Sequence, residues 1–367
     1  MPKIMLEKHS RKLSIYSPMA DQTLRVAATV AVYNEAAGVR DLLDALLAQS
    51  RPLDQVVIVD DGSSDTTPEI LHEYAEREAS VLVISQKNQG PAVARNKAWR
   101  AAEADLCLFT DGDCVPEVQW AEKLIAPFVD SAANSTIGAV GGSYRTLNTH
   151  STLAKFIGSE IDWRYRNVSG EISAHGTYSL AVRRTILEKI GGFNEAYPKP
   201  SGEDFDLTYK ISCQHRILFE PAARVGTQHP EHLGQYLKIQ ARRAYDRIRL
   251  YGDHPEQAHS DNYTEATVKY EILSALFLLP LLVLGFFVNE LFWLCGVLVT
   301  FLIYCRFSLF RYQLGDSFSL ALGGAGIAFV RNYAWAVGLI AGVVRLGSSA
   351  FSIVSGKNSN QLKLSVD

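Results

Sequence analysis

The stretch Gln55–Asp65 reads QVVIVDDGSSD and joins a run of apolar, β-branched residues directly to acidic and small polar ones. A run this short, rich in valine and isoleucine and followed by turn residues, predicts a buried β-strand. Three further runs of this kind occur at Val26–Tyr33, Ser80–Ser85 and Asp105–Thr110. Helical patterns separate them, at Val39–Leu47, from Thr66 onward and at Pro91–Ala104. Strands that alternate with helices predict an α/β fold with a parallel sheet and crossover helices.

Polar and acidic side chains follow the ends of three of these predicted strands. In open α/β sheets, ligands bind beyond the carboxyl ends of the strands. An acidic rim there suits a divalent cation such as Mg²⁺ or Mn²⁺ together with the ribose and base of a nucleotide. The chain has no G-x-G-x-x-G or G-x-x-x-x-G-K-[ST] loop after the first strand, so we do not expect a dinucleotide-binding site or a P-loop there. The residues of the rim are Asn34, Glu35, Asp60, Asp61, Asp111 and Asp113.

Length, charge and cysteine content narrow the class of protein. The chain has 367 residues, 47% of them hydrophobic, which allows a large buried core and excludes intrinsic disorder. Its 36 Lys and Arg against 39 Asp and Glu give a formal charge of −3, so the chain as a whole carries no positive field for nucleic acid. The five cysteines form no C-x-x-C pair, which indicates reduced thiols and neither a disulfide framework nor a zinc site.

A second acidic cluster, Gly202–Asp206 (GEDFD), opens a helix predicted over Glu203–Gln214. Acids at a helix start are favoured by the helix dipole alone, so a purely structural interpretation of this cluster stays open. The chemical interpretation is that Asp204 is a general base. A carboxylate near a metal site can take the proton of an acceptor hydroxyl while the metal stabilises a leaving diphosphate.

Three apolar runs in the last hundred residues predict a membrane region. They are Ile272–Val288, Leu291–Cys305 and Phe318–Val344, the last interrupted by Arg331 and Asn332. That interruption leaves the third segment open between a span and a re-entrant or interfacial pair. Residues 1–23 contain no apolar core of a signal peptide, so we expect the α/β part to stay in the cytoplasm, and Arg306 and Arg311 fit that orientation.

A basic amphipathic helix is predicted over Leu233–Tyr251, directly before the membrane region. It interleaves five basic residues with leucine, tyrosine and isoleucine. A helix of this composition typically lies in the headgroup plane of a membrane.

Five motifs in order along the chain resemble those of the family 2 glycosyltransferases. They are VAVYNE at 30–35, VIVDDGSSDT at 57–66, NQG at 88–90 with ARN at 94–96, TDGD at 110–113, and GGF at 191–193 with GED at 202–204. The family consists of inverting, nucleotide-sugar-dependent enzymes with a GT-A fold, a Rossmann-like mixed sheet. The one departure is Ala31, where the family usually has proline.

The resemblance implies roles for individual residues. Tyr33, Glu35 and Asp61 would contact the nucleobase and ribose, with Asp60 sharing that role, and Arg95 would lie near the diphosphate. Asp111 would touch the ribose or the metal, Asp113 would ligate Mn²⁺ or Mg²⁺, and Asp204 would be the base. Arg243 would stabilise the diphosphate. Candidates for contact with the acceptor are His175, Tyr178, Ser179, Glu203 and Gln240.

Processive members of the family carry a Q-x-x-R-W signature on an interfacial helix. Here Gln240 and Arg243 are present but Ala244 stands in place of the tryptophan that would stack on the acceptor sugar. We therefore expect one sugar to be added per encounter. The implied domains are an extension over 1–23, the GT-A domain over 24–230, an interfacial helix and linker over 231–268, a membrane region over 269–346 and a polar tail over 347–367.

The resulting hypothesis is an inverting, metal-dependent transfer of a sugar, with UDP-sugar as the expected donor, to a hydroxyl of a membrane lipid or lipid-linked saccharide. The enzyme would be a multi-pass protein of the cytoplasmic membrane with its catalytic domain in the cytoplasm, acting in polysaccharide or glycolipid synthesis. The alternatives are a polyprenyl-phosphate glycosyltransferase, a processive polysaccharide synthase and a catalytically dead membrane scaffold.

Overall fold

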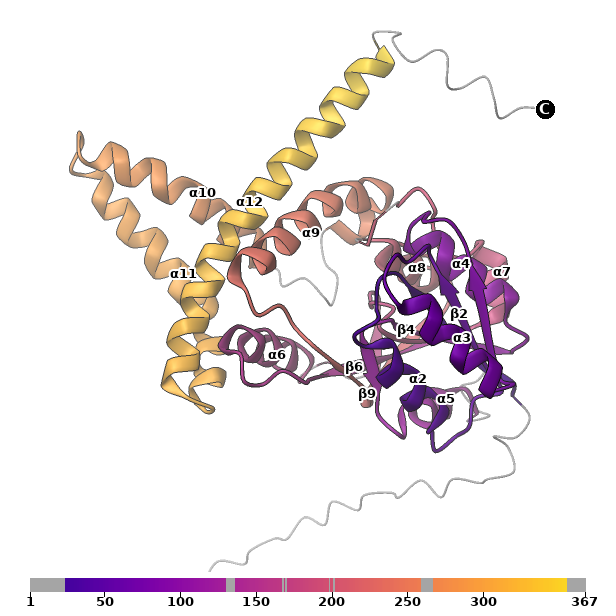
Figure 1. Cartoon of the computed structure of the whole chain (residues 1–367). Helices are drawn as coiled ribbons and strands as arrows, with labels where there is room; N and C mark the ends of the chain where they lie inside the picture. Colours follow the sequence, from indigo (N-terminus) through magenta and orange to yellow (C-terminus); the bar gives the residue numbers. More distant parts are fainter. Residues whose placement is uncertain are drawn as a thin grey trace, which may run out of the picture.

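The computed structural model describes residues 24–129, 136–166, 168, 170–197, 199–200, 202–258 and 267–354, with only the backbone given for 346–354 (Figure 1). The predicted extension over 1–23 and the end of the predicted tail lie outside the described residues. An α/β domain adjoins a group of long helices formed by the last part of the chain (Figure 1).

Nine strands within the described residues form one mixed sheet, in the order β3-β2-β1-β4-β8-β6-β9-β5, with β7 paired to β9. The first three strands and β4 are parallel to one another, whereas β8 runs antiparallel to β4 and β6. The strands are β1 Val26–Val32, β2 Gln55–Asp60, β3 Val81–Ser85, β4 Leu106–Asp111, β5 Cys114–Pro116, β6 Ile137–Thr146, β7 Gly170–Ile172, β8 Ser179–Arg183 and β9 Arg216–Thr227.

Helices cover both faces of the sheet. On one face a core of leucine, isoleucine and valine packs beneath α2, α3 and α5, and on the other a core richer in alanine and aromatic residues packs beneath α4, α7 and α8. The helices are α2 Val39–Leu47, α3 Thr67–Arg77, α4 Pro91–Ala101, α5 Trp120–Val129, α7 Arg184–Ile190 and α8 Glu203–Ser212. The predicted α/β architecture is confirmed.

The register of the parallel strands brings their acidic ends to one edge of the sheet. Val32 at the end of β1 lies opposite Asp60 of β2, and Ala31 lies opposite Asp111 of β4. Because the three strands end level, the loops that follow them all emerge at the same edge.

Three helices in the described part of the chain are long and apolar enough to cross a membrane: α10 Val268–Gly285, α11 Leu291–Leu314 and the first part of α12 Phe318–Val354. The possibility that the third segment breaks at Arg331 and Asn332 is wrong, because α12 runs through both residues without interruption. Both side chains are buried, and Arg331 is paired with Glu160. The helix also continues into the predicted tail.

Two more helices connect this region to the α/β domain, namely α6 Thr152–Tyr165 and α9 Leu233–Asp253 (Figure 1). The predicted amphipathic helix is α9. The sequence patterns considered above did not predict α6, which packs with α9, α11 and α12 around Phe156.

The contact between α9 and α12 depends on two glycines one helical turn apart. A Cβ atom on Gly338 would lie 2.0 Å from the carbonyl oxygen of Ala241, and one on Gly342 would lie 2.8 Å from that of Tyr245. Small residues four apart let two helix backbones approach closely, which is common between helices in membranes. The same Cβ on Gly338 would lie 2.9 Å from the Cβ of Ala244, so this contact also restricts the size of residue 244.

We predict that Gly338→Ala destabilises the protein by about 1–3 kcal/mol, because the added methyl overlaps the backbone of α9. The matched control is Gly326→Ala on the same helix, where a Cβ meets nothing within 4 Å. That control should be neutral or stabilising by up to about 1 kcal/mol. Thermal unfolding of the two purified variants in the same detergent makes the comparison, and equal melting temperatures would contradict the described packing.

Candidate active site

Two aspartates at the end of β2, Asp60 and Asp61, hold the loop that follows this strand. Asp60 and Asp61 are both 4% exposed. The carboxylate of Asp60 accepts the backbone N–H of Ser63 at 2.9 Å. The carboxylate of Asp61 accepts three hydrogen bonds from the loop before α4, from the Gln86 side chain and from the N–H groups of Gln89 and Gly90. Asp61 therefore fixes where α4 begins.

Two backbone positions at this edge adopt positive φ. Gly62 has φ +79°, and a Cβ there would lie 2.8 Å from the backbone nitrogen of Asn88, so only glycine fits. Asn34 has φ 58° and accepts the Ser64 N–H through its side-chain oxygen at 2.8 Å. These contacts join the loops after β1 and β2, and Tyr33 beside them is 48% exposed.

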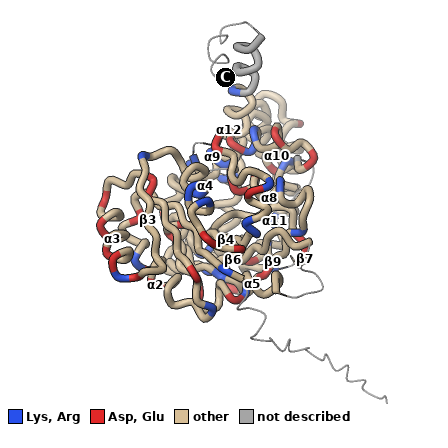
Figure 2. Tube along the Cα trace, turned by 90° about the vertical axis from the view of Figure 1, so that its right-hand side faces the viewer, with Lys and Arg blue, Asp and Glu red and all other residues tan. Residues whose placement is uncertain are grey.

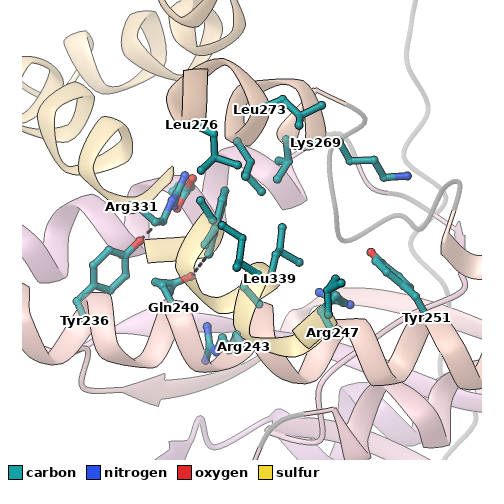
Figure 3. Close-up of a pocket in the computed structure, with 18 of the residues that line it drawn as sticks. Tyr236, Gln240, Arg243, Arg247, Tyr251, Lys269, Leu273, Leu276, Arg331 and Leu339 are labelled. Atoms are coloured by element: carbon teal, nitrogen blue, oxygen red, sulfur yellow. Dashed lines mark hydrogen bonds and ion pairs between the residues drawn. The ribbon is translucent and has the colours of Figure 1, made fainter. Parts of the chain in front are cut away.

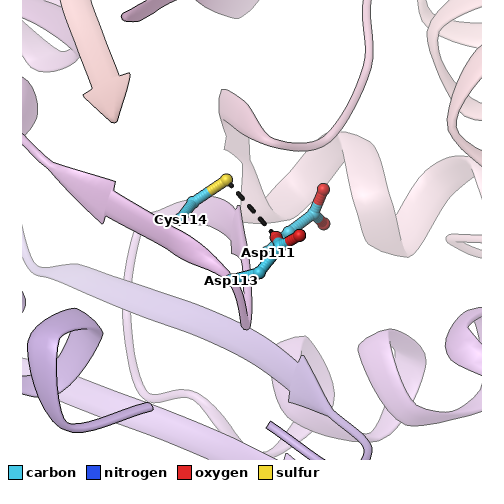
Figure 4. A group of neighbouring side chains, drawn as sticks. All are labelled: Asp111, Asp113 and Cys114. Carbon is cyan, nitrogen blue, oxygen red and sulfur yellow. Dashed lines mark hydrogen bonds between the residues drawn. The ribbon is translucent and has the colours of Figure 1, made fainter. Parts of the chain in front are cut away.

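Asp111, Asp113 and Cys114 form the one group in the described residues with the spacing of metal ligands (Figure 4). One potential ligand atom from each lies within 4.8 Å of the others. Burial and the charges of Asp111 and Asp113 raise the pKa of the Cys114 thiol well above its usual range. The two carboxylates are the hard oxygen donors that Mn²⁺ and Mg²⁺ prefer.

Negative charge accumulates around these carboxylates. Partial burial, followed by the charges of Asp113, Asp111 and Asp65, raises the pKa of Glu35 to about 7. Enclosure by the protein and the charge of Asp111 raise the pKa of Asp113 as well. Repulsion of this kind is relieved by a bound cation, so the residues present fit a divalent metal.

Arg95 on α4 joins two acidic parts of the site. Its Nη2 donates to Asp111 at 2.8 Å and its Nη1 donates to Glu203 at 2.7 Å. The Arg95 side chain is 10% exposed and the Glu203 side chain 4%. Glu203, predicted to contact an acceptor, lines the pocket described next, with its carboxylate paired to Arg95. Figure 2 shows the mixture of acidic and basic residues around β4, α8 and α9.

A pocket of about 190 Å³ lies beside this ion pair, and we call it the α8 pocket. Asp204 lines it, with one carboxylate oxygen accepting the Phe205 N–H at 2.8 Å. Burial and the neighbouring charge of Glu203 raise the pKa of Asp204 to about 7, although Arg95 opposes the shift. A carboxylate with this pKa is half ionised near neutral pH, which is the range in which a general base works best.

Aromatic residues form another wall of the α8 pocket. Tyr178 and Tyr144 both line it, and their rings stack with centroids 3.6 Å apart. Tyr178 is one of the predicted acceptor residues. Tyr144 was missed because a half-buried tyrosine on a strand has no pattern that marks it as part of a site.

His175 and Ser179 do not line the α8 pocket, contrary to the expectation for them. Both side chains are fully buried. The imidazole of His175 lies between the carbonyl oxygens of Gly176 and Gly142, 2.7 and 2.8 Å from its ring nitrogens. The Ser179 hydroxyl accepts the indole N–H of Trp120 at 2.9 Å in the core. His175 lies 3.2 Å from the hydroxyl of Tyr178 and so supports that wall of the pocket from behind.

Two of the predicted residues lie on α9, and one of them reaches the site. Arg243 lines the α8 pocket. Gln240 does not, because it is 8% exposed and accepts the indole N–H of Trp335 on α12 at 3.0 Å. Ala244 also faces α12, which explains why a tryptophan is absent there.

The mixed sheet and its acidic edge form a GT-A-like α/β domain. Residues 28–191 match the family model described as glycosyl transferase family 2, so this part of the chain is a family 2 glycosyltransferase domain, as predicted. A mannosyltransferase from Pyrobaculum calidifontis, solved in complex with GDP-Man and Mn²⁺, shares the fold with a TM-score of 0.56 and 20% identity, over 86% of this chain and 87% of that one.

Two curated relatives are similar in sequence. The probable glycosyltransferase YdaM of Bacillus subtilis is 28% identical over 225 residues, which are 56% of this chain and 51% of YdaM. The poly-beta-1,6-N-acetyl-D-glucosamine synthase of Staphylococcus epidermidis is 27% identical over 248 residues, 64% of this chain and 58% of the synthase. The chain thus spans little more than half the length of these relatives.

We predict that Arg95→Gln destabilises the protein by about 3–5 kcal/mol, because the buried Glu203 and the half-buried Asp111 both lose their ion pair with the guanidinium. Arg100→Gln on the same helix is the control, since the Arg100 side chain is 51% exposed and its loss should cost less than about 1 kcal/mol. Thermal or denaturant unfolding of both variants tests this. A variant at 95 as stable as the one at 100 would show that the ion pair does not hold the site.

Proposed function

We propose that the chain transfers a single sugar, with inversion, from a nucleotide-sugar donor to a hydroxyl of a lipid or lipid-linked saccharide at the cytoplasmic face of a membrane. The observation that carries the proposal is the place of Asp204, whose carboxylate lines a pocket bounded by Arg95, Asp111 and the helix α9. Helix α9 packs against α12, the first part of which is long and apolar enough to span a membrane.

The donor would bind at the acidic edge of the sheet. Tyr33 and Glu35 would contact the base and ribose, beside the loops that the buried Asp60 and Asp61 hold in place. Asp111 and Asp113 would hold Mn²⁺ or Mg²⁺. When bound, the metal supplies positive charge that neutralises the diphosphate leaving group. The Pyrobaculum mannosyltransferase was solved with GDP-Man and Mn²⁺, which supports this class of donor and metal. We propose UDP as the nucleotide and include GDP in the test below.

The transfer step needs a base on the acceptor side. Asp204 takes the proton of the acceptor hydroxyl as the oxygen attacks the anomeric carbon, and the bond from that carbon to the diphosphate oxygen breaks. One displacement inverts the anomeric configuration. Arg243, on the wall of the α8 pocket, would stabilise the diphosphate charge that develops.

Transfer of one sugar per encounter is supported by the surroundings of Ala244. Residue 244 packs beside Gly338 of α12 and does not reach the α8 pocket, so it offers no stacking platform for a growing chain. The curated relatives include a polysaccharide synthase, so a processive reaction is the alternative to transfer of a single sugar. Arg306 and Arg311 at the end of α11 support a multi-pass protein of the inner membrane with its domain in the cytoplasm.

A second candidate is transfer to a polyprenyl phosphate. The observation that favours it is a basic cavity next to α9, lined among others by Arg243, Arg247 and Arg331. A phosphate acceptor is already ionised and needs no strong base.

The substitution Asp204→Asn separates the two candidates. With a hydroxyl acceptor, activity should fall by about 100-fold or more, since general base catalysis is removed. The wild-type kcat/KM should fall about tenfold per pH unit below pH 7, because a protonated Asp204 cannot accept the proton. Asp41→Asn, an exposed aspartate on α2, is the control. Substantial activity in Asp204→Asn with a flat pH profile would favour the phosphate acceptor.

The donor and metal are identified by thermal stability. The melting temperature of the detergent-purified protein is measured with UDP, GDP, CMP and dTDP, each with and without Mn²⁺, because a ligand of the folded state raises it. We expect one nucleotide to give a shift that depends on metal. Asp113→Ala should abolish the metal-dependent part of that shift. A full shift in Asp113→Ala, or in excess EDTA, would contradict the metal site.

A further inference from the structure

A cavity of about 570 Å³ lies between α9, α10 and α12, with α6 at one end, and we call it the membrane cavity (Figure 3). Leu273 and Leu276 of α10 and Leu339 of α12 form its apolar wall. The opposite wall is the face of α9 that carries Tyr236, Gln240 and Arg247 (Figure 3). The cavity is thus enclosed by two helices able to span a membrane and by the helix that reaches the α8 pocket.

Positive charge dominates the membrane cavity. Glu160 is the one acidic residue among the described side chains that line it, against six basic ones. An apolar cavity whose lining has this excess of basic over acidic residues is complementary to an amphiphile with an anionic head. The basic residues are Arg164, Arg243, Arg247, Lys269, Arg306 and Arg331.

Arg331 has donors that the protein leaves unused. Its side chain is 2% exposed, and its Nη1 donates to Glu160 and to the hydroxyl of Tyr236. Its Nε and Nη2 are buried and have no hydrogen-bond partner among the described residues, although the guanidinium stacks on Trp335. Buried donors without partners are costly, and an anion in the cavity would satisfy them.

Glu160 is not available to satisfy these donors further. Burial opposes its ionisation, yet Arg331 lowers the pKa of Glu160 to about 2, so it remains charged. Its two oxygens already face two cations, Arg331 and, at 3.6 Å, Arg306. Arg306 also pairs with Glu271 at 2.7 Å. The local carboxylates are therefore fully engaged.

The membrane cavity and the α8 pocket share two lining residues on α9. Arg243 and Arg247 line both the membrane cavity and the α8 pocket that contains Asp204. A phosphate group paired with these two arginines in the cavity would thus lie one helix wall away from the pocket that Asp204 lines.

We propose that the membrane cavity binds the acceptor through its lipid phosphate: a phosphate or diphosphate pairs with Arg331 and the arginines of α9, and the hydrocarbon chain lies between α10 and α12. This inference rests on the proposed function, in that it takes the acceptor to be lipid-linked. It adds the chemical group that is recognised and the residues that recognise it.

The test measures binding to the full chain in detergent by native mass spectrometry or by thermal shift. The probes are a polyprenyl phosphate, the matching polyprenol, phosphatidylglycerol and inorganic phosphate. The wild type should bind the polyprenyl phosphate at least about tenfold more tightly than each of the others. Arg331→Gln should lose about tenfold in that affinity. Arg311→Gln, on α11 and outside the cavity lining, is the matched control and should bind normally.

Because Arg331→Gln leaves Glu160 with one partner fewer and can impair folding, a second variant fills the cavity and keeps its charges. Leu339→Trp should also abolish binding of the polyprenyl phosphate. Equal binding of polyprenol or of phosphatidylglycerol by the wild type would overturn the inference. So would normal binding by a folded Arg331→Gln or by Leu339→Trp.

The nucleotide and Mn²⁺ response of the same variants keeps this test separate from the proposed function. Loss of lipid binding with an intact nucleotide response supports the inference and locates the defect in the cavity. If the wild type binds the polyprenyl phosphate but transfers no sugar to any lipid acceptor, the proposed function fails while the binding site stands.

Discussion

The buried guanidinium of Arg95 joins two carboxylates that would otherwise repel each other across the site. It fixes Asp111, at the end of β4, relative to Glu203, at the start of α8, and so sets where Asp204 stands. The position of Arg95 depends in turn on α4, whose first turn is anchored by the hydrogen bonds of Asp61. Asp61, just after a strand, thus orients α4. Helix α4 in turn carries Arg95, whose charge connects Asp111 with Glu203.

The sheet and its acidic edge could be predicted because local patterns encode them. Short β-branched runs mark the strands, and the acids follow them directly, so a parallel register brings Asp60 and Asp111 together. The pairing of Arg95 with Glu203 could not be predicted, since 108 positions separate them and no local pattern links them. The burial of Ser179 could not be predicted either, because the sequence of a short strand does not show whether a serine faces a pocket or the core.

The sequence left open whether α12 is one continuous helix, because Arg331 and Asn332 interrupt its apolar run. Hydropathy adds contributions along one segment and ignores partners elsewhere. Arg331 is tolerated because Glu160, 171 positions earlier on α6, meets it in the folded chain. From the sequence, the absence of a tryptophan at position 244 indicated only that no side chain stacks on a sugar there. The structure adds a steric cause, because Ala244 packs against Gly338 of α12.

The reliance of α9 on α12 limits how the molecule can be divided for laboratory use. A truncated protein ending after α9 would retain every carboxylate of the acidic edge, yet the helix face that contacts Gly338 and Gly342 would be uncovered. The same helix supplies Arg243 and Arg247 to the pocket wall, so its orientation would no longer be fixed. Preparations that keep the helices in detergent or a lipid disc, and not water-soluble fragments, are therefore the appropriate material for studying catalysis.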